Sequence, residues 1–456
     1  MPFVNRGREL DQLRSWWAFP GASMGMVWGR RRVGKTALLQ HFAADFPTVF
    51  HTGAGRPAAA ELAALSRAAA RVLDTGVRDL ESRPFADWED ALETLAAAAR
   101  SRKVLLILDE LPALAESSSG LPDLLRAVWD RISSQSKLKV LLCGSAVRTM
   151  EAMQEERAPL YGRLDLSLLL HPFSPHEAAM MLRSLKPAQR ALVWGLVGGM
   201  PLYLRWWDQS ASVRSNLLRL ACTPGSPLLT EGQLVLATEA DGGDLARQVL
   251  YAIAAGRTRF NEIEQAVRAD PNRTLDRLVA LRLVDRIAPV TENPQRTRRR
   301  IYRIADNFLG FWLSVLDRYR PEIDRGLGES ILPVLLDSLD DHMGGPWEDA
   351  FRAHLRRLAV SGDLGDEVVA IGPFWTAGED PGGIDAVALA GRGRSAVLLG
   401  EAKWRKQVDG SRLRADLQRK AVAVPNLAAR PRFAICARES VAGDDDLLRL
   451  TAEDIF

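Results

Sequence analysis

The chain has 456 residues, of which 47% are hydrophobic and 26% are charged. This mixture excludes a disordered or collagen-like chain, and the length predicts about three domains. With 60 Lys and Arg against 57 Asp and Glu, the net charge of +3 excludes a polycationic coat for nucleic acid but leaves room for a local basic patch.

The cysteines and histidines exclude two further classes. Cys143, Cys222 and Cys436 are far apart, and the six histidines have no metal-ligand spacing, so we expect neither a disulfide framework nor a zinc ribbon. Three unpaired cysteines suit a reducing cytosol, so we expect a cytoplasmic protein. The first residues lack the apolar core of a signal peptide, and the longest uncharged apolar stretch, residues 191–204, is too short to cross a bilayer. We therefore expect no membrane association.

In the first part of the chain, short apolar runs that predict strands alternate with amphipathic stretches that predict helices. In chain order we expect a helix at 8–17, a strand at 24–28, a loop at 29–36, a helix at 37–44, a strand at 48–51, helices at 61–73 and 88–100, a strand at 104–108, a helix at 121–133 and a strand at 139–143. Strands that alternate with helices indicate a parallel α/β sheet.

After about residue 172 the pattern becomes mainly helical. We expect helices at 175–185, 187–197 and 201–208, a boundary at 223–243, short helices at 245–255, 260–267 and 271–281, strands at 284–290 and 300–304, and a connecting helix at 306–319. Three helices followed by a hairpin are the outline of a winged helix. Beyond a break at 344–346 we expect a helix, three strands that include 384–389 and 395–400, a helix at 413–424 and a strand at 432–436.

A phosphate-binding loop is predicted at Gly29-Arg30-Arg31-Arg32-Val33-Gly34-Lys35-Thr36, which matches GxxxxGK[ST] between a strand and a helix. Glycines let backbone N–H groups surround an anion at the start of a helix. Lys35 can reach the β- and γ-phosphates, and the Thr36 hydroxyl can bind Mg²⁺. The loop therefore predicts ATP and Mg²⁺ as ligands, with all eight of its residues in the nucleotide site. The alternative for its three arginines is a solvated face.

The strand at 104–108 is followed by Asp109 and Glu110. Asp109 can hold the water shell of the metal, and Glu110 can polarise the attacking water, which predicts hydrolysis as well as binding. Ser145 ends the next strand and is either a contact of the γ-phosphate or an ordinary turn residue. Arg148, Arg157 and Arg163 follow, and any of them could reach a phosphate.

Six segments together resemble the archaeal-type ATPases, a STAND-related branch of the AAA+ proteins. They are Phe3-Val4-Asn5-Arg6, Trp28 to Thr36, Leu108-Asp109-Glu110, Cys143-Gly144-Ser145, Pro159-Leu160-Tyr161-Gly162-Arg163 and Gly198-Gly199-Met200-Pro201. The resemblance implies an ATPase core, a helical lid that carries the Gly-Gly-x-Pro turn, and a winged helix. It also implies that Pro201 lies near the nucleotide base and that Arg163 is the better-placed arginine.

Arginines gather in the predicted winged helix. Arg273 and Arg277 fall on its third helix, the position of a recognition helix, and Arg298, Arg299 and Arg300 lie on the predicted wing. Contacts with DNA phosphates would give salt-dependent affinity that is mostly blind to sequence. The alternative is that the domain serves as an intramolecular lid or an oligomer contact and that these arginines are solvated.

Near the end of the chain, two apolar strands carry acidic residues. Asp385 opens one strand, and Glu401 and Lys403 are two residues apart on the next, so the latter two share a face. In a hairpin, Asp385 and Glu401 can hold Mg²⁺ or Mn²⁺, and Glu348 can add a carboxylate. Lys403 can then either orient or activate the hydrolytic water or stabilise the pentavalent phosphate. The alternative is a surface ion pair on an edge strand. The region resembles the PD-(D/E)xK, restriction-endonuclease-like nucleases, with Ile384 in place of the Pro.

The sequence therefore predicts an α/β protein of five segments. They are a P-loop ATPase core at 1–172, a helical lid at 173–235, a winged helix at 240–305, a helical connector at 306–343 and a nuclease-like α/β domain at 344–456. We expect an ATP-hydrolysing protein that acts on DNA and cleaves it with Mg²⁺. Two alternatives stay open. One is a nucleotide-gated regulator whose C-terminal domain only binds DNA or protein, and the other is an assembly ATPase whose winged helix is an interaction surface, for example in a homo-oligomer.

Overall fold

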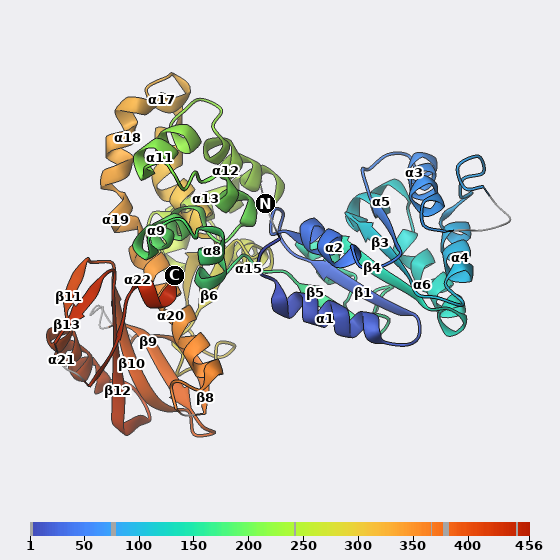
Figure 1. Ribbon diagram of the computed structural model, residues 1–456. Coiled ribbons are helices and arrows are strands. Elements are labelled where there is room, and N and C mark those ends of the chain that lie inside the picture. The colour runs from blue at the N-terminus through green and yellow to red at the C-terminus, as the bar shows by residue number, and fades with distance from the viewer. Residues whose placement is uncertain (1–2, 74–78, 241–242, 366, 377–382, 444–445) are drawn as a thin grey trace. The chain divides into compact units, whose positions relative to one another are not determined.

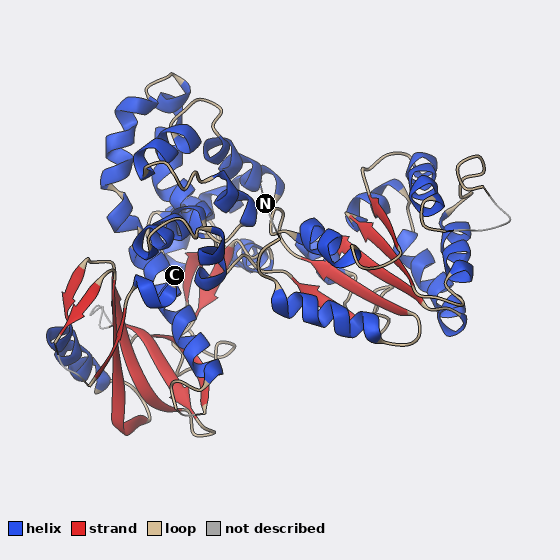
Figure 2. Cartoon of the chain, in the orientation of Figure 1, coloured by secondary structure: helices blue, strands red, loops and turns tan. Residues whose placement is uncertain are grey.

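The computed structural model describes residues 3–73, 79–240, 243–365, 367–376, 383–443 and 446–456. The chain forms two compact units, Met1–Pro172 and Phe173–Phe456. Figure 1 labels many of the helices and strands, and Figure 2 shows helices in blue and strands in red. Within the described residues, no helix is both long enough and apolar enough to cross a membrane.

The first unit contains a five-stranded parallel sheet in the order β2-β3-β4-β1-β5. Its strands are β1 (Ser23–Trp28), β2 (Thr48–Thr52), β3 (Val104–Asp109), β4 (Leu138–Gly144) and β5 (Leu166–Leu169). Every residue of β1, β3 and β4 is buried. Because both faces of a parallel sheet are covered, such strands appear in the sequence as continuous apolar runs, which is why they were predictable.

Helices complete the first unit. They are α1 (Gly7–Ala18), α2 (Lys35–Ala43), α3 (Ala58–Ala70), α4 (Trp88–Ala98), α5 (Leu111–Ser117), α6 (Leu121–Ile132), the short η1 (Ser133–Gln135) and α7 (Val147–Ala152). The hydrophobic core contains side chains from strands β1, β2, β3 and β4 and from helices α3, α4 and α6. All the predicted elements of this part are present with slightly shifted ends, whereas α5, α7 and β5 were not predicted. The edge strand β5 has only Leu168 buried, so its sequence signal is weaker than that of a central strand.

The second unit begins with five helices. They are α8 (Pro175–Met181), α9 (Pro187–Val197), α10 (Pro201–Trp206), α11 (Val213–Ala221) and α12 (Pro227–Thr238). Helix α12 corrects the prediction of a boundary at 223–243, because most of that segment is helical and part of it is buried. A Cβ atom at Gly232 would lie 2.1 Å from the ring of Trp312. This glycine therefore serves close packing inside a helix, in a segment whose composition suggests a boundary.

Three helices and an antiparallel ribbon follow in the predicted order. They are α13 (Gly243–Ala254), α14 (Phe260–Val267), α15 (Asn272–Ala280), β6 (Val284–Ile287) and β7 (Ile301–Ile304). The segment predicted as one connecting helix is divided into α16 (Asn307–Phe311), the π-helical η2 (Trp312–Leu316) and η3 (Asp317–Tyr319). Next come α17 (Arg320–Asp324), α18 (Gly328–Asp337), α19 (Leu339–His342) and α20 (Gly344–Ser361). The predicted break at 344–346 is the first turn of α20.

The C-terminal part of the second unit is a mixed sheet in the order β14-β12-β10-β9-β8. Its elements are β8 (Val368–Phe374), β9 (Ile384–Ala390), β10 (Ser395–Lys403), β11 (Gln407–Asp409), α21 (Gly410–Ala421), β12 (Leu427–Ala437), β13 (Ser440–Ala442), β14 (Leu447–Leu450) and α22 (Ala452–Ile455). Strand β9 pairs antiparallel with β8 and β10, while β12 runs parallel to β10 and β14.

Helices α20 and α21 cover opposite faces of this sheet. On β10, Leu399 packs in one hydrophobic cluster with Leu417 of α21, whereas a Cβ atom at the next residue, Gly400, would meet the ring of Phe351 on α20. Successive residues of a strand point to opposite faces. Glu401 and Lys403 therefore belong to the face that α21 covers.

Candidate functional site

The phosphate loop of the first unit joins β1 to α2 and has an unusual backbone. Gly29, Arg32 and Gly34 have φ angles of 146°, 65° and 96°. A Cβ atom at Gly29 would lie 2.5 Å from the carbonyl oxygen of Leu170, so this position requires glycine. The Nζ atom of Lys35 donates to the carbonyls of Gly29 and Arg30, both at 2.9 Å. The loop thus curls around the side chain of Lys35, and its positive φ angles are typical of loops whose backbone N–H groups bind anions.

Thr36 and Asp109 meet at the carboxyl edge of the sheet. The Thr36 hydroxyl donates to Oδ2 of Asp109 at 2.8 Å, while Oδ1 accepts from the backbone N–H of Glu110 at 3.0 Å. Asp109 is only 1% exposed. A hydroxyl beside a carboxylate is an oxygen-only donor set, which fits Mg²⁺. These two residues would hold the metal that accompanies a bound nucleotide.

Glu110 and Ser145 are brought together from neighbouring strands. Glu110 follows β3 with a φ of 53°, and its Oε2 accepts from the Ser145 hydroxyl at 3.0 Å. Ser145 follows the end of β4, as the sequence predicts. The hydroxyl therefore orients the carboxylate predicted to polarise water, and its contact with a γ-phosphate stays a prediction.

The arginines of the loop differ from one another. Arg31 is exposed and Arg32 is half-buried, but Arg30 is only 6% exposed. The alternative of a solvated face therefore does not describe Arg30, and its contact with a nucleotide stays a prediction. Arg163 donates from Nε and Nη2 to the two carboxylate oxygens of Asp130 at 2.9 and 2.8 Å, and this hydrogen bonding lowers the pKa of Asp130. To reach a nucleotide phosphate, Arg163 would have to leave this pair.

Arg6 supports the loop from outside, a role that sequence reasoning missed. Its guanidinium is 4% exposed and donates to the carbonyls of Val33 at 3.0 Å and His171 at 2.7 Å. It also pairs with Glu9 at 2.9 Å. The available signal was its place in the Phe3–Arg6 segment. Pro201, by contrast, begins α10 in the second unit, so its position beside the nucleotide base stays a prediction.

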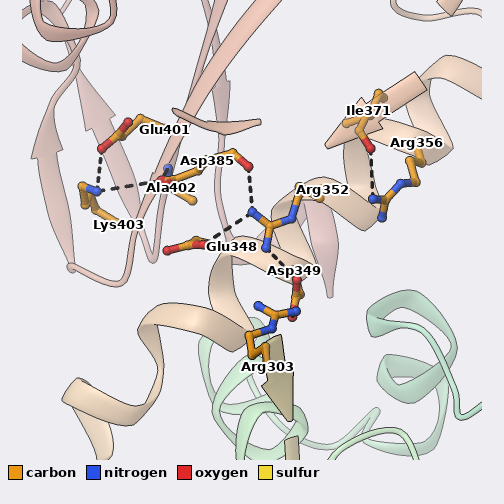
Figure 3. Close-up of polar contacts among 10 residues, drawn as sticks. All are labelled: Arg303, Glu348, Asp349, Arg352, Arg356, Ile371, Asp385, Glu401, Ala402 and Lys403. Carbon is orange, nitrogen blue, oxygen red and sulfur yellow. Dashed lines mark hydrogen bonds and ion pairs between the residues drawn. The ribbon is translucent and has the colours of Figure 1, made fainter. Parts of the chain in front are cut away.

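The structure brings Asp385, Glu401 and Lys403 together on β9 and β10 (Figure 3). Lys403 Nζ lies 2.6 Å from Oε1 of Glu401 and 3.8 Å from Oδ2 of Asp385. The backbone N–H of Ala402 donates to the same Asp385 oxygen at 2.9 Å. Because β10 continues to Lys403, the acid and the lysine share a face as predicted. A surface ion pair is a poor description of this group, since Glu401 is 6% exposed.

Glu348 does not join the two carboxylates as a third metal ligand. Within the described residues, no group of three or more His, Cys, Asp or Glu residues could hold a metal ion. The carboxylate of Glu348 instead lies 3.4 Å from Nη1 of Arg352, one turn along α20. Asp385 and Glu401 still offer two carboxylates from adjacent strands, and Mg²⁺ is commonly bound by one or two carboxylates together with water.

Two basic residues at this site were not predicted. Arg352 is buried and donates to the backbone carbonyl of Asp385 at 2.7 Å and to Asp349 at 2.6 Å (Figure 3). Lys420 of α21 donates to the carbonyl of Gly383 at 2.9 Å and to Oε2 of Glu401 at 3.3 Å. The chain has only eight lysines, which was the available signal for Lys420. Arg352 is one of many arginines, so the sequence carried no signal that marked it.

The protonation of the site reflects its burial. Burial, with the charges of Glu348 and Glu401, raises the pKa of Asp385 to about 7. Burial also raises the pKa of Glu348, against the opposing effect of Arg352. Burial disfavours the charged Lys403, but Asp385 and Glu401 outweigh it and raise its pKa. Clustered acids with raised pKa values are typical of functional sites.

The predicted DNA-binding arginines lie on two elements. Arg273 and Arg277 are on α15, where Arg273 is exposed and Arg277 is half-buried. Arg298 and Arg299 are exposed in the loop between β6 and β7, and Arg300 is half-buried just before β7. The structure thus presents both sets on the surface of the same three-helix and ribbon segment.

Comparison with known proteins gives two matching families. The model for an ATPase domain predominantly from Archaea matches residues 3–206, and a model for archaeal and bacterial proteins of unknown function matches residues 312–416. The chain is also similar to the uncharacterized protein MJECL04 of Methanocaldococcus jannaschii, at 24% identity over 430 residues that cover 92% of each chain.

Two solved structures are similar as well. The Walker-type ATPase PABY2304 of Pyrococcus abyssi has 19% identity and a TM-score of 0.50, over 69% of this chain and 96% of that one. The ORC2 protein of Aeropyrum pernix has 17% identity and a TM-score of 0.45, over 73% of this chain and 96% of that one. The matched family, the phosphate loop and the parallel sheet agree: this chain carries a P-loop ATPase domain, which the family model assigns to residues 3–206.

Proposed function

We propose that this protein binds and hydrolyses ATP and acts on DNA, and that its C-terminal site hydrolyses phosphodiester bonds. The observation that carries the nuclease proposal is the position of Lys403, whose ammonium lies 2.6 Å from Glu401 and 3.8 Å from Asp385 on adjacent strands. Two carboxylates on adjacent strands can bind a metal ion, and an ammonium group beside them can contact the oxygens of a phosphate that the metal ion holds.

In the ATPase site, each residue has a separable task. Lys35 and the loop N–H groups bind the phosphates, and Thr36 with Asp109 holds Mg²⁺. Glu110, oriented by Ser145, accepts a proton from the attacking water. Replacing Glu110 with Gln should therefore keep ATP binding while it lowers hydrolysis about a hundredfold or more.

In the C-terminal site, a bound Mg²⁺ ion would polarise the phosphate and lower the pKa of a water. Asp385 and Glu401 hold the metal, and Lys403 stabilises the charge that develops on the phosphate oxygens. Water attacks phosphorus and releases a proton to the solvent, the bond to the leaving oxygen breaks, and that oxygen takes up a proton from the solvent. The exposed arginines of α15 and of the loop before β7 hold DNA by its phosphates.

The test is cleavage of linear, circular and single-stranded DNA in Mg²⁺ or Mn²⁺, with and without ATP. We expect nicking that Asp385→Asn and Lys403→Ala abolish while ATP hydrolysis continues at the wild-type rate. The matched control is Lys406→Ala, because Lys406 is exposed and pairs with Glu439 outside the site. The nuclease proposal fails if no metal supports nicking, or if both lysine variants behave alike.

A second candidate is a nucleotide-gated DNA-binding regulator that does not cut. The pairing of Glu401 with both Lys403 and Lys420 favours it, since two ammonium groups can neutralise the carboxylate without a metal. A regulator would shift DNA in a gel with a steep salt dependence and show no nicking. An assembly ATPase would show neither property and would change its oligomeric state when nucleotide is added.

A further inference from the structure

An arginine-lined cavity of about 540 Å³ lies within the second unit. Its walls come from the starts of α14 and α15, the loop between β6 and β7, and the chain just after β8. The lining residues are Arg259, Phe260, Asn261, Asn272, Arg296, Thr297, Arg298, Arg299, Arg300, Ile301, Tyr302, Trp375 and Thr376. The cavity thus gathers side chains that are far apart in the sequence.

The cavity is strongly basic although the whole chain is nearly neutral. Five of its lining residues are arginines, and none of those described is Asp or Glu. Arg299 is partly neutralised by Glu292, which pairs with it. Among the described residues, Arg259, Arg296 and Arg298 form no ion pair, so their charges remain available to a ligand. Such a concentration of guanidinium groups fits an anion with several oxygens.

The volume of the cavity and its uncharged lining residues indicate which class of anion it can bind. A volume of this order suits a ligand of small-molecule size and is too small for a double helix. Half-buried Phe260 and Trp375 supply aromatic surface, while Asn261 and Asn272 supply amides. Basic groups interleaved with aromatic rings are typical of sites that bind single-stranded nucleic acid through its phosphates and stacked bases.

The cavity is joined to the strands that carry the candidate cleavage site. The N–H of Val290 donates to the carbonyl of Pro373 at 2.8 Å, and Arg394 donates to the carbonyl of Val290 at 2.9 Å. Trp375 follows Phe374, which is the register partner of Ile384 on β9. Ile384 precedes Asp385. One wall of the cavity therefore follows directly on the strand residue that pairs with the neighbour of Asp385.

We propose that this cavity anchors one or two nucleotides of a single DNA strand by their phosphates, beside the site at Asp385. The proposal rests on the proposed function in taking DNA as the substrate. It divides the predicted DNA-binding arginines into two groups: Arg298, Arg299 and Arg300 line the cavity, whereas Arg273 and Arg277 do not.

The test is fluorescence anisotropy with the full chain carrying Lys403→Ala, in EDTA so that no cleavage interferes. The probes are a 12-nucleotide single strand and the same sequence as a blunt duplex. We compare Arg298→Glu and Arg296→Glu with the control Arg247→Glu, which makes the same charge change at an exposed position of α13 outside the cavity. Two exposed cavity positions guard against the failure of one variant to fold.

We expect each cavity variant to weaken single-strand binding about tenfold and to lower the slope of log affinity against log salt by about 0.7 for each lost phosphate contact. Arg247→Glu should change affinity less than twofold. Equal weakening by all three variants, or by none, overturns the proposal. The proposal is also overturned if free dTMP displaces the single strand at a concentration equal to that of the strand's nucleotides, because the cavity would then bind a mononucleotide as well as it binds a strand. This assay measures binding without cleavage. If the protein never nicks DNA, the nuclease proposal fails but the binding proposal can still be tested.

Discussion

Arg352 donates a hydrogen bond to the backbone carbonyl of Asp385 at 2.7 Å, and its guanidinium also contacts Glu348 and Asp349 (Figure 3). Asp349 in turn pairs with Arg303 of β7. One buried arginine of α20 therefore holds the strand end that carries the candidate metal ligand. It also connects this strand end to the ribbon whose loop lines the basic cavity.

This contact predicts a positioning role for Arg352. Arg352→Lys keeps the charge but loses the forked hydrogen bonds, so Asp385 should be held less well. We expect the Mg²⁺ concentration for half-maximal nicking to rise about tenfold or more, as is usual for residues that support metal ligands, with ATP hydrolysis unchanged.

The matched control is Arg356→Lys on the same helix. Arg356 also donates to a backbone carbonyl of the sheet, that of Ile371 at 3.1 Å, but on β8. Calorimetric Mn²⁺ binding without nucleotide gives a second readout that does not depend on cleavage. Equal metal requirements in the two variants would show that Arg352 only stabilises the fold.

A second prediction concerns Arg6 and the phosphate loop. Arg6→Gln removes the guanidinium that holds the carbonyl of Val33, so the loop should lose part of its ordered shape before ATP arrives. We expect the Kd for ATP to rise about tenfold, measured by calorimetry. The exposed neighbour Arg8, changed to Gln, is the control and should leave the Kd unaltered. An unchanged Kd for ATP in Arg6→Gln would show that Arg6 does not support the phosphate loop.

Gly232 provides a test of packing in the second unit. A Cβ atom there would enter the ring of Trp312, so Gly232→Ala should cost about 1–3 kcal/mol of unfolding free energy or more. Gly344→Ala is the control, because a Cβ atom at Gly344 has no described atom within 4 Å and the residue is helical. That change should be neutral or slightly stabilising. Thermal unfolding measures both variants. An equal loss of stability in the two would contradict the close packing of Gly232 against Trp312.

The pH dependence of stability is predicted from Lys139, which lies in the first unit under the rings of Trp16 and Phe19. Burial, and then the charge of Lys103, lower the pKa of Lys139 to about 8. The unfolded chain therefore binds more protons than the folded one between pH 8 and the ordinary lysine pKa of about 10.4, and folding stability rises with pH over that window.

Lys139→Met removes this titration. Below pH 8 the variant avoids the cost of a buried charge, so its free energy of unfolding should exceed that of the wild type. This difference should shrink by as much as about 3 kcal/mol as the pH rises to about 10.4. Unfolding followed by denaturant titration at several pH values measures the difference. A constant difference across this range would mean that Lys139 titrates at the same pH in the folded and unfolded chains.

Local sequence was sufficient for elements whose signal is continuous. The fully buried strands β1, β3 and β4 appear as uninterrupted apolar runs, and the phosphate loop has fixed spacing, so both were predictable. The pair Glu401 and Lys403 was predictable because residues two apart on a strand must share a face. Helix α12 was not, because the Gly and Pro in this segment indicate a boundary. In the structure Pro227 begins the helix and Gly232 makes room for the ring of Trp312.

The sequence by itself determined the ATPase fold, the phosphate loop with its acidic partners, and the spacing of the C-terminal carboxylate and lysine. Only the tertiary structure decided that Arg6, Arg352 and Lys420 support these sites, that Glu348 is held by Arg352, and that five arginines surround one cavity. The physical reason is that a charged side chain carries no local mark of burial. Whether it faces water or holds a distant carbonyl depends on which segments the fold packs against it.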